Sequence, residues 1–161
     1  LLENEVDLAV HSLKDLPTEK IAGLCIGAIP ERERPWDAWV SSTHADLIDL
    51  PPGSKVATGS HRRQAQILNR FPHLECIPIR GNIDTRIHKY SELGAQGVIL
   101  AAAGLRRTGR QEFIRAELGP TEMTPAPGQG ALALETREDC TELLACLASV
   151  GCSWSSFWKP E

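Results

Sequence analysis

Arginine and lysine are the residues of this sequence whose placement most clearly indicates chemistry. Cations closely follow four predicted strands, and they are Lys14, Arg62 with Arg63, Arg80, and Arg106 with Arg107. Ligands of open α/β sheets bind outside the carboxyl ends of the strands. We therefore expect these cations to converge on one crevice that binds an anion. Carboxylates suit the planar guanidinium fork, and the sequence contains no glycine-rich phosphate-binding motif.

The distribution of charge supports an anionic ligand. The 161-residue chain has a formal net charge of −4, yet residues 55–115 carry eleven Lys or Arg against four Asp or Glu. A basic middle within an acidic chain indicates a local anion site rather than a generally basic surface. A nucleic-acid-binding module is disfavoured, because this segment offers only Phe71, Tyr90 and Phe113 for base stacking.

Ser60 is a good N-cap, which places Arg62 and Arg63 in the first turn of a helix. Cations there face the positive end of the helix dipole, at a cost of about 0.3–1 kcal/mol each. An anion bound at the helix N-terminus would offset that cost. The alternative is a solvated arginine pair on a surface helix.

Arg80 and Arg86 flank a second turn of the same kind. Gly81 lets the backbone bend sharply there, and we expect Asp84 or Thr85 to cap the following helix. Arg86 then lies near the start of that helix. The alternative is an ordinary strand-to-helix turn with one structural arginine.

Asp15, beside Lys14, is the one acid within this basic set. A carboxylate surrounded by cations stays ionised, so it can stabilise a developing positive charge or an N–H proton on the substrate. The alternatives are an N-cap or a salt-bridged structural aspartate. His11 is interpreted as a packed strand residue, because no Ser/His/Asp spacing supports nucleophilic catalysis.

Alternating strands and helices are predicted to position these residues. Apolar runs predict strands at 6–12, 24–29, 36–41, 55–58, 76–79 and 97–103. Helical stretches are expected at 61–71, 84–93 and 111–118. Such repeated strand–turn–helix units are typical of an α/β fold with a largely parallel sheet.

Two segments look like crossings between lobes, the charged stretch 31–35 and the Pro/Gly-rich stretch 124–130. The second lobe would then comprise 36–123, and residues 1–30 plus 131–148 a partial first lobe. A chain that leaves a lobe and returns to it predicts a two-lobed clamp with its ligand in the cleft. The alternative for 124–130 is a plain hinge.

The five cysteines show no Cys-x-x-Cys pair and no metal-ligand spacing. We expect reduced, mostly buried thiols in a cytosol-like compartment. No apolar run reaches the roughly 20 residues of a membrane helix. The chain opens on Leu1 without a leader and is interpreted as a fragment or a processed chain, so a plastid location with a lost transit peptide stays open.

Five ordered segments closely resemble the porphobilinogen deaminase (hydroxymethylbilane synthase) family: Val10–Pro17, Thr58–Gln64, Arg80–Arg86, Ala102–Arg107 and Pro127–Ala131. The resemblance implies lobes like those of type II periplasmic binding proteins, with mostly parallel sheets, the second lobe near complete and the first partial. It implies a transferase of tetrapyrrole and heme biosynthesis. Such enzymes join four porphobilinogen molecules, with loss of ammonia, into the linear hydroxymethylbilane on a covalently bound dipyrromethane cofactor.

The resemblance also implies residue roles. Asp15 would be the catalytic carboxylate, which contacts pyrrole N–H groups and stabilises the cationic azafulvene. The implied cofactor contacts are Ser12, Lys14, Asp15, Thr58, Ser60, Arg62, Arg63, Arg80, Gly81 and Arg86. The implied substrate contacts are Arg62, Arg107 and Gln129. We expect a monomer that uses no metal and binds neither nucleic acid nor membrane.

The sequence departs from the family in three places. The family's N-terminal strand, with its cleft arginine, and its third domain, with the cysteine that carries the cofactor, are missing. The tail 149–161 does not resemble the family, so Cys152 is not assigned as the attachment site. We expect this chain to be inactive by itself. The alternative function is a non-catalytic clamp for small polycarboxylate anions, which would share the arginines but not need Asp15.

Overall fold

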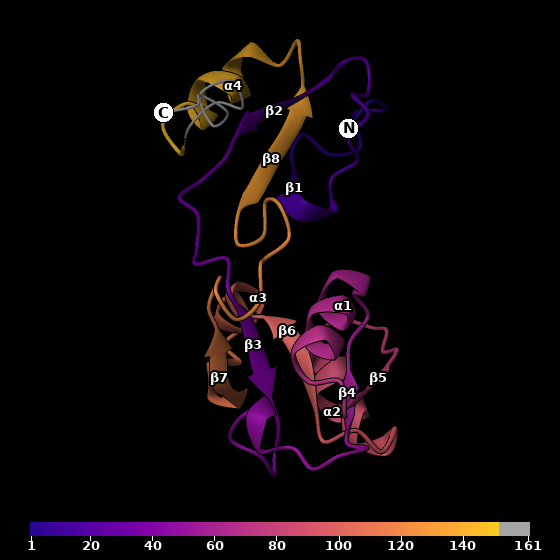
Figure 1. The fold of residues 1–161 in the computed structure, drawn as a ribbon. Helices are drawn as coiled ribbons and strands as arrows, with labels where there is room; N and C mark the ends of the chain where they lie inside the picture. Colours follow the sequence, from indigo (N-terminus) through magenta and orange to yellow (C-terminus); the bar gives the residue numbers. More distant parts are fainter. Residues whose placement is uncertain (152–161) are drawn as a thin grey trace. The chain divides into compact units, whose positions relative to one another are not determined.

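The computed structural model describes residues 1–151 and divides into two units. Unit 1 comprises Leu1–Glu33 and the chain from Pro127 onward, and unit 2 comprises Arg34–Ala126 (Figure 1). Both boundaries fall inside the segments 31–35 and 124–130 that the sequence marks as crossings. A hinge function for these segments stays a prediction.

Unit 2 is built on a five-stranded mixed sheet in the order β5-β4-β6-β3-β7. The strands are β3 (Asp37–Val40), β4 (Lys55–Ala57), β5 (Glu75–Ile77), β6 (Gly97–Ala101) and β7 (Ile114–Leu118). β4 runs parallel to β5 and β6, whereas β3 runs antiparallel to β6 and β7. The helices are α1 (His61–Arg70), α2 (Ile83–Glu92) and α3 (Ala102–Arg107), with 3-10 turns η2 (Leu47–Asp49) and η3 (Gln111–Phe113).

Apolar clusters bury both faces of this sheet. Along β6, Val98 and Leu100 point to the cluster that contains Ile87 of α2, whereas Ile99 points to the cluster that contains Ile67 of α1. This alternation follows from the two-residue period of a strand. It explains why β6 is apolar throughout, as strands covered on both faces are.

Unit 1 holds a three-stranded antiparallel sheet in the order β1-β8-β2. Its elements are β1 (Ala9–Ser12), the 3-10 turn η1 (Leu13–Asp15), β2 (Leu24–Ala28), β8 (Leu132–Arg137) and α4 (Thr141–Leu147). Leu147 of α4 packs on Ala28 and Leu134 to form a small apolar cluster.

The six predicted strands and the helices at 61–71 and 84–93 are present, with bounds that differ from the predicted ones by up to three residues. The helix predicted at 111–118 is wrong, because that segment forms η3 and then β7, which pairs with β3. A short apolar stretch fits the periodicity of a helix as well as that of a strand, and here pairing with the neighbouring strand makes it a strand. The sheets also contain fewer parallel pairs than expected. In unit 2, β3 runs antiparallel to both of its neighbours, β6 and β7, and the sheet of unit 1 has no parallel pair among the described residues.

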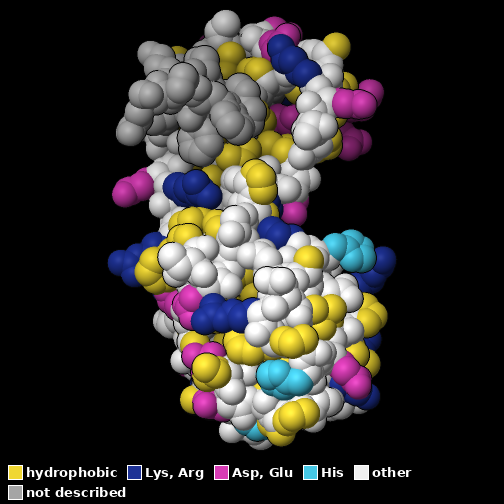
Figure 2. All heavy atoms as spheres, viewed as in Figure 1, with side chains coloured by type: hydrophobic (Ala, Val, Ile, Leu, Met, Phe, Trp, Pro, Cys, Tyr) yellow, Lys and Arg dark blue, Asp and Glu magenta, His cyan; other side chains and the backbone are white. Residues whose placement is uncertain are grey.

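The surface carries charges of both signs. On the face drawn in Figure 2, cationic and anionic side chains of unit 2 alternate with apolar ones. Within residues 1–151, no helix is long and apolar enough to cross a membrane.

Candidate functional site

The carboxyl ends of three neighbouring strands define one edge of the unit 2 sheet. Because β5, β4 and β6 are parallel and adjacent, the segments that follow them leave the sheet at the same edge (Figure 1). The segment after β4 leads into α1, the segment after β5 leads into α2, and β6 is followed directly by α3. We call this the cationic edge, defined by Thr58–Arg63, Arg80–Arg86 and the start of α3.

The turn before α1 is shaped by Thr58 and Ser60. The buried Thr58 accepts the Ser60 N–H through its hydroxyl at 3.2 Å, and Ser60 accepts the Arg63 N–H at 3.5 Å. Ser60 is therefore the N-cap, as predicted. Gly59 lies between them, where an added Cβ would be 2.7 Å from the carbonyl oxygen of Ile79, so the two loops of the edge approach too closely for a side chain.

Arg62 and Arg63 converge on the buried carboxylate of Asp37. Arg63 donates to Asp37 Oδ1 from Nε at 3.0 Å and from Nη2 at 2.6 Å, and Arg62 Nη2 donates to Oδ2 at 2.8 Å. The Arg63 side chain is 6% exposed and that of Arg62 is 23% exposed. The alternative of a solvated pair is thus wrong for both, and the cofactor contacts predicted for them stay predictions.

The turn before α2 is capped by Asn82 rather than by Asp84 or Thr85. Asn82 Oδ1 accepts the backbone N–H and the hydroxyl of Thr85, each at 2.8 Å. Asp84 pairs instead with Arg110 at 2.7 Å, and this partner raises the pKa of the Arg110 guanidinium. The expectation of an Asp84 or Thr85 cap is wrong because Asn82 stands one residue before the helix, where a cap must be.

Gly81 adopts a φ of +122°, and an added Cβ would lie 2.6 Å from Thr85 Cγ2. This conformation requires glycine. The Gly81 carbonyl accepts Arg86 Nε at 2.7 Å, which orients that side chain over the turn. Arg80 is exposed and has no hydrogen bond or ion pair with any residue of 1–151.

The two arginines of α3 lie at the opposite end of that helix from the edge. Arg106 pairs with Glu117 of β7, and Arg107 is exposed. At 1.5 Å per residue, Arg107 lies roughly 8 Å along the helix from Ala102. The structure therefore sets Arg107 apart from the arginines around Asp37.

In unit 1, Asp15 ends the turn η1 and is exposed. It makes no hydrogen bond or ion pair within residues 1–151, so it is neither a helix cap nor a salt-bridged structural aspartate. Ser12 and Lys14 are exposed beside it. Ser12, Lys14 and Asp15 are close together because they lie within four consecutive positions of the sequence.

The loop 127–131 braces this turn. Leu13 N–H donates to the carbonyl of Ala131 at 3.0 Å. Gly128 has a φ of +69°, and its added Cβ would lie 3.0 Å from Leu13 Cγ and 3.2 Å from Lys14 N. Gln129 is 1% exposed and its carbonyl accepts Arg32 Nε at 2.9 Å. Its predicted substrate contact stays a prediction.

His11 differs from the expectation of a packed strand residue. Its Nε2 lies 3.1 Å from Glu135 Oε2, and the side chain is 36% exposed. The reason is that β1 is an edge strand of a three-stranded sheet, which leaves its side chains partly in solvent.

Asp37 is the residue that sequence reasoning missed. It was read only as part of the apolar run at 36–41. A signal was available, because a carboxylate inside a strand covered on both faces needs a buried cation, and Arg62 and Arg63 are a pair of cations that the helix dipole does not favour. Their separation of about 25 residues hid the pairing.

The four described cysteines are free thiols, and none of them is fully buried, so the expectation of mostly buried thiols is wrong. Partial burial raises the pKa of both Cys25 and Cys76 above its ordinary value. These thiols stay protonated at neutral pH. Among residues 1–151, no three His, Cys, Asp or Glu side chains gather as metal ligands would. Cys152 lies outside the described residues.

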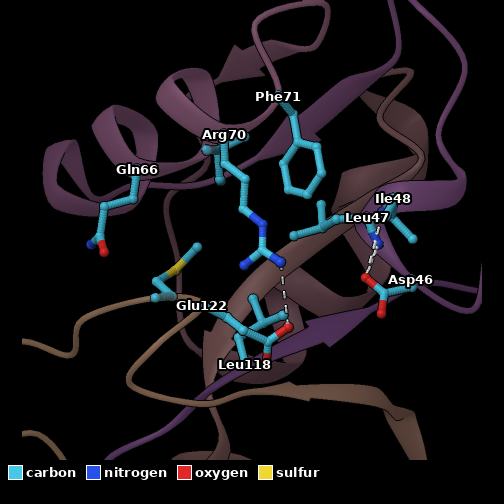
Figure 3. Close-up of a pocket in the computed structure, with 10 residues that line it drawn as sticks. Asp46, Leu47, Ile48, Gln66, Arg70, Phe71, Leu118 and Glu122 are labelled. Carbon is cyan, nitrogen blue, oxygen red and sulfur yellow. Dashed lines mark hydrogen bonds and ion pairs between the residues drawn. The ribbon is translucent and has the colours of Figure 1, made fainter.

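A surface pocket of about 180 Å³ lies elsewhere on unit 2 (Figure 3). Leu47, Phe71 and Leu118 line it, and Arg70 faces Glu122 across it at 3.9 Å. Arg70 ends α1, whereas Arg62 begins it. None of the predicted site residues lines this pocket.

The family model for porphobilinogen deaminase, dipyromethane cofactor binding domain, matches residues 1–145. The chain belongs to the porphobilinogen deaminase family. It is 53% identical over 151 residues to the porphobilinogen deaminase of Staphylococcus carnosus, and 51% identical over 146 residues to that of Laribacter hongkongensis. These alignments cover 93% and 91% of the chain but 49% and 47% of the relatives, so the chain spans about half the length of these curated relatives.

Solved structures share the fold at low sequence identity. A pheromone precursor/lipoprotein from Enterococcus faecalis gives a TM-score of 0.60 at 12% identity, and a periplasmic substrate-binding protein of an ABC transporter from Coxiella burnetii gives 0.57 at 14%. Each match covers 92% of this chain and 72% of the other. The predicted α/β fold of periplasmic-binding-protein type is thereby confirmed.

The residues of the cationic edge fit the dipyrromethane group that the family domain binds. That group presents carboxylates, which are acceptors only, and the edge offers the guanidinium donors of Arg62, Arg80 and Arg86. Gly59 and Gly81 keep the two turns free of side chains where the backbone is most crowded. A donor set of this kind matches the charge of the cofactor.

Proposed function

We propose that the intact protein carrying this chain is a transferase that joins four porphobilinogen molecules head to tail, with loss of ammonia, into the linear hydroxymethylbilane. One observation carries the proposal: in a member of this family, the cationic edge gathers Arg62, Arg80 and Arg86 at the carboxyl ends of parallel strands. Each pyrrole bears an acetate and a propionate. The growing chain is therefore a polyanion, which several guanidinium groups can bind at once.

Unit 2 supplies most of the binding groups in this proposal, and unit 1 supplies Ser12, Lys14, Asp15 and Gln129. The dipyrromethane cofactor supplies the covalent primer from which the chain grows. Its contacts, and those of the growing chain, are Ser12, Lys14, Asp15, Thr58, Ser60, Arg62, Arg63, Arg80, Gly81 and Arg86. Arg62, Arg107 and Gln129 contact the incoming substrate. The separation of Arg107 from the arginines around Asp37 suits a contact with a different pyrrole.

Asp15 is the catalytic carboxylate in this proposal. As ammonia leaves porphobilinogen, positive charge develops on the pyrrole and its N–H becomes a stronger donor. An ionised carboxylate beside that ring accepts the N–H hydrogen bond and stabilises the charge. Asp15 is exposed and has no hydrogen bond within residues 1–151, so its oxygens need not leave an intramolecular partner first.

The test is turnover of porphobilinogen by the intact protein. We expect consumption of porphobilinogen with release of one ammonia per pyrrole and formation of hydroxymethylbilane, followed by mass spectrometry of enzyme-bound pyrroles. The 161-residue chain alone is expected not to turn over, because the resemblance places the cofactor-bearing cysteine in a further domain. Binding of porphobilinogen without consumption by the intact protein would instead support the polycarboxylate clamp.

The proposal includes a monomer that acts in the cytoplasm on a small molecule. We expect the intact protein to sediment at the molecular mass of a single chain. We also expect to recover it in the cytoplasmic fraction. Salt-dependent retention on random DNA would contradict the assignment, because the positive charge would then serve a phosphate backbone.

A further inference from the structure

Asp37 is wholly buried at the start of β3, and it lies at the cationic edge. Its partner across the sheet is Ala101, the last residue of β6. The edge where β6 ends is also the edge where α1 begins, which brings the carboxylate under the first turn of that helix. No residue role derived from the sequence or from the family resemblance involves Asp37.

The two oxygens of Asp37 are divided between two arginines. Oδ1 accepts both bonds from Arg63, at 3.0 and 2.6 Å, and Oδ2 accepts the bond from Arg62 at 2.8 Å. Arg63 also donates from Nη1 to the carbonyl of Ile99 at 3.0 Å. Arg63 is therefore a fixed, buried counter-ion, whereas Arg62 uses only one of its nitrogens on the carboxylate.

The second hold on Arg62 comes from Thr124. Arg62 Nη1 donates to the Thr124 carbonyl, and the same carbonyl accepts Gln66 Nε2 at 3.2 Å. Gln66 Oε1 in turn accepts the Thr124 N–H at 2.7 Å. Gln66 lies one helical turn after Arg62, so α1 clamps Thr124 with two side chains and the guanidinium is held from two sides.

A guanidinium held in this way is prepared to bind an anion. A free arginine side chain carries about 2 kcal/mol of rotamer entropy that binding must remove. The bonds to Asp37 and Thr124 remove much of that freedom before a ligand arrives. The Arg62 side chain is still 23% exposed, so part of it remains open to solvent.

We propose that Asp37 is a positioning residue, which fixes the guanidinium of Arg62 at the cationic edge so that it binds a pyrrole carboxylate without rearrangement. Arg63 serves as the buried counter-ion of Asp37. The inference rests on the proposed function in one respect, since it takes Arg62 as a ligand contact. The inference adds Asp37, which acts through Arg62 and contacts no ligand itself, to the residues of the proposed site.

The experiment compares Asp37→Asn, Arg62→Lys and the double variant in the intact protein. We expect each single variant to raise KM for porphobilinogen roughly tenfold with kcat little changed, because a uniform binding contact is lost. The double variant should be no worse than either single one, because Asp37 acts through Arg62. ¹⁵N NMR of the arginine side chains should show faster rotation of the Arg62 guanidinium in Asp37→Asn.

Ser41→Ala is the matched structural control. Ser41 lies just after the other end of β3, is buried, and donates to the Gln96 carbonyl at 2.6 Å. Its loss should lower the melting temperature and leave KM unchanged. Asp37→Asn overturns the proposal if it behaves as Ser41→Ala does, or if its effect on KM multiplies with that of Arg62→Lys.

Asp37→Asn leaves Arg63 buried without its counter-ion and can prevent folding. The comparison then uses Arg63→Gln alone against Arg63→Gln with Asp37→Asn, which differ only at Asp37. A higher KM and a freely rotating Arg62 in the double variant support the proposal, and equal values in the two proteins overturn it. An unaltered protein that does not consume porphobilinogen refutes the proposed function, while the NMR comparison still tests the hold on Arg62.

Discussion

The two units support their candidate functional groups in different ways. In unit 2, Arg62 and Arg63 are fixed by the buried Asp37, beneath a helix that Ser60 caps. In unit 1, Asp15 stands in solvent at the end of a three-residue turn. The comparison shows that the fold places buried polar contacts behind Arg62 and leaves Asp15, the proposed catalytic carboxylate, without such contacts. Changes in the two units should therefore separate effects on binding and stability from effects on turnover.

The largest effect is expected from Asp15→Asn. Turnover of porphobilinogen by the intact protein should fall roughly a hundredfold or more, because the charge that stabilises the transition state is removed. The melting temperature should stay unchanged, because Asp15 has no intramolecular partner in residues 1–151. Asp49→Asn is the matched control, since Asp49 is an exposed aspartate that also ends a three-residue 3-10 turn. Normal turnover by Asp15→Asn would refute its catalytic role.

The brace under Asp15 is tested by Gly128→Ala. The variant combines a positive φ with contacts of 3.0 and 3.2 Å to Leu13 and Lys14, so it should lower the free energy of unfolding by about 2–4 kcal/mol and reduce turnover. Gly109→Ala has nearly the same φ, +67° against +69°, and nothing within 4 Å. It should lose only about 1–2 kcal/mol in urea denaturation. Equal losses of unfolding free energy in the two variants would show that the contacts of Gly128 with Leu13 and Lys14 do not contribute.

Arg80→Ala tests a proposed binding cation that carries no structural contact. The rate of chain elongation, followed by mass spectrometry of the enzyme-bound pyrroles, should fall about tenfold, as expected for the loss of one charged hydrogen bond to the growing chain. Stability should not change, because Arg80 is exposed and unpaired within residues 1–151. Lys89→Ala is the control, since Lys89 is an exposed cation in the last turn of α2, away from the edge. An unaltered elongation rate in Arg80→Ala would contradict its assignment to the site.

The smallest effect concerns the thiols of the two units. Burial raises the pKa of Cys76 in β5, so its reactive thiolate forms only at higher pH. At pH 8, iodoacetamide should modify the exposed Cys146 of α4 several times faster than Cys76, as read by peptide mapping. Raising the pH should narrow the difference, and urea should abolish it. Equal rates in the folded protein would contradict the burial of the β5 thiol.

Local signals in the sequence predict most of the elements and the edge of the sheet at which Arg62 and Arg80 lie, but not the position of Arg106 and Arg107 at the far end of α3. Ser60 caps α1 because its hydroxyl reaches an N–H three residues away, and the apolar run of β6 indicates a strand covered on both faces. Arg62 and Arg80 reach the edge because each closely follows a strand of one parallel set, and Arg86 is held there by its bond to the Gly81 carbonyl. Such inferences need only the neighbouring residues.

Pairings between distant residues could not be predicted in the same way. Asp37 and Arg63 are separated by 26 residues, and Leu13 meets Gly128 from the other end of the chain. β7 is a strand because β3 offers it a free edge, although its own residues also fit a helix. The role of Arg63 depends on such tertiary geometry, whereas the cap by Asn82 rather than Asp84 depends only on the residue at which α2 begins.

The order of the strands in unit 1 has a consequence for synthesis on the ribosome. β8 lies between β1 and β2, yet it is made more than a hundred residues after them. Unit 2 is a continuous segment and can fold while β8 is still absent. The turn that holds Asp15 therefore gains its hydrogen bond to Ala131 only after the arginine-bearing sheet is complete.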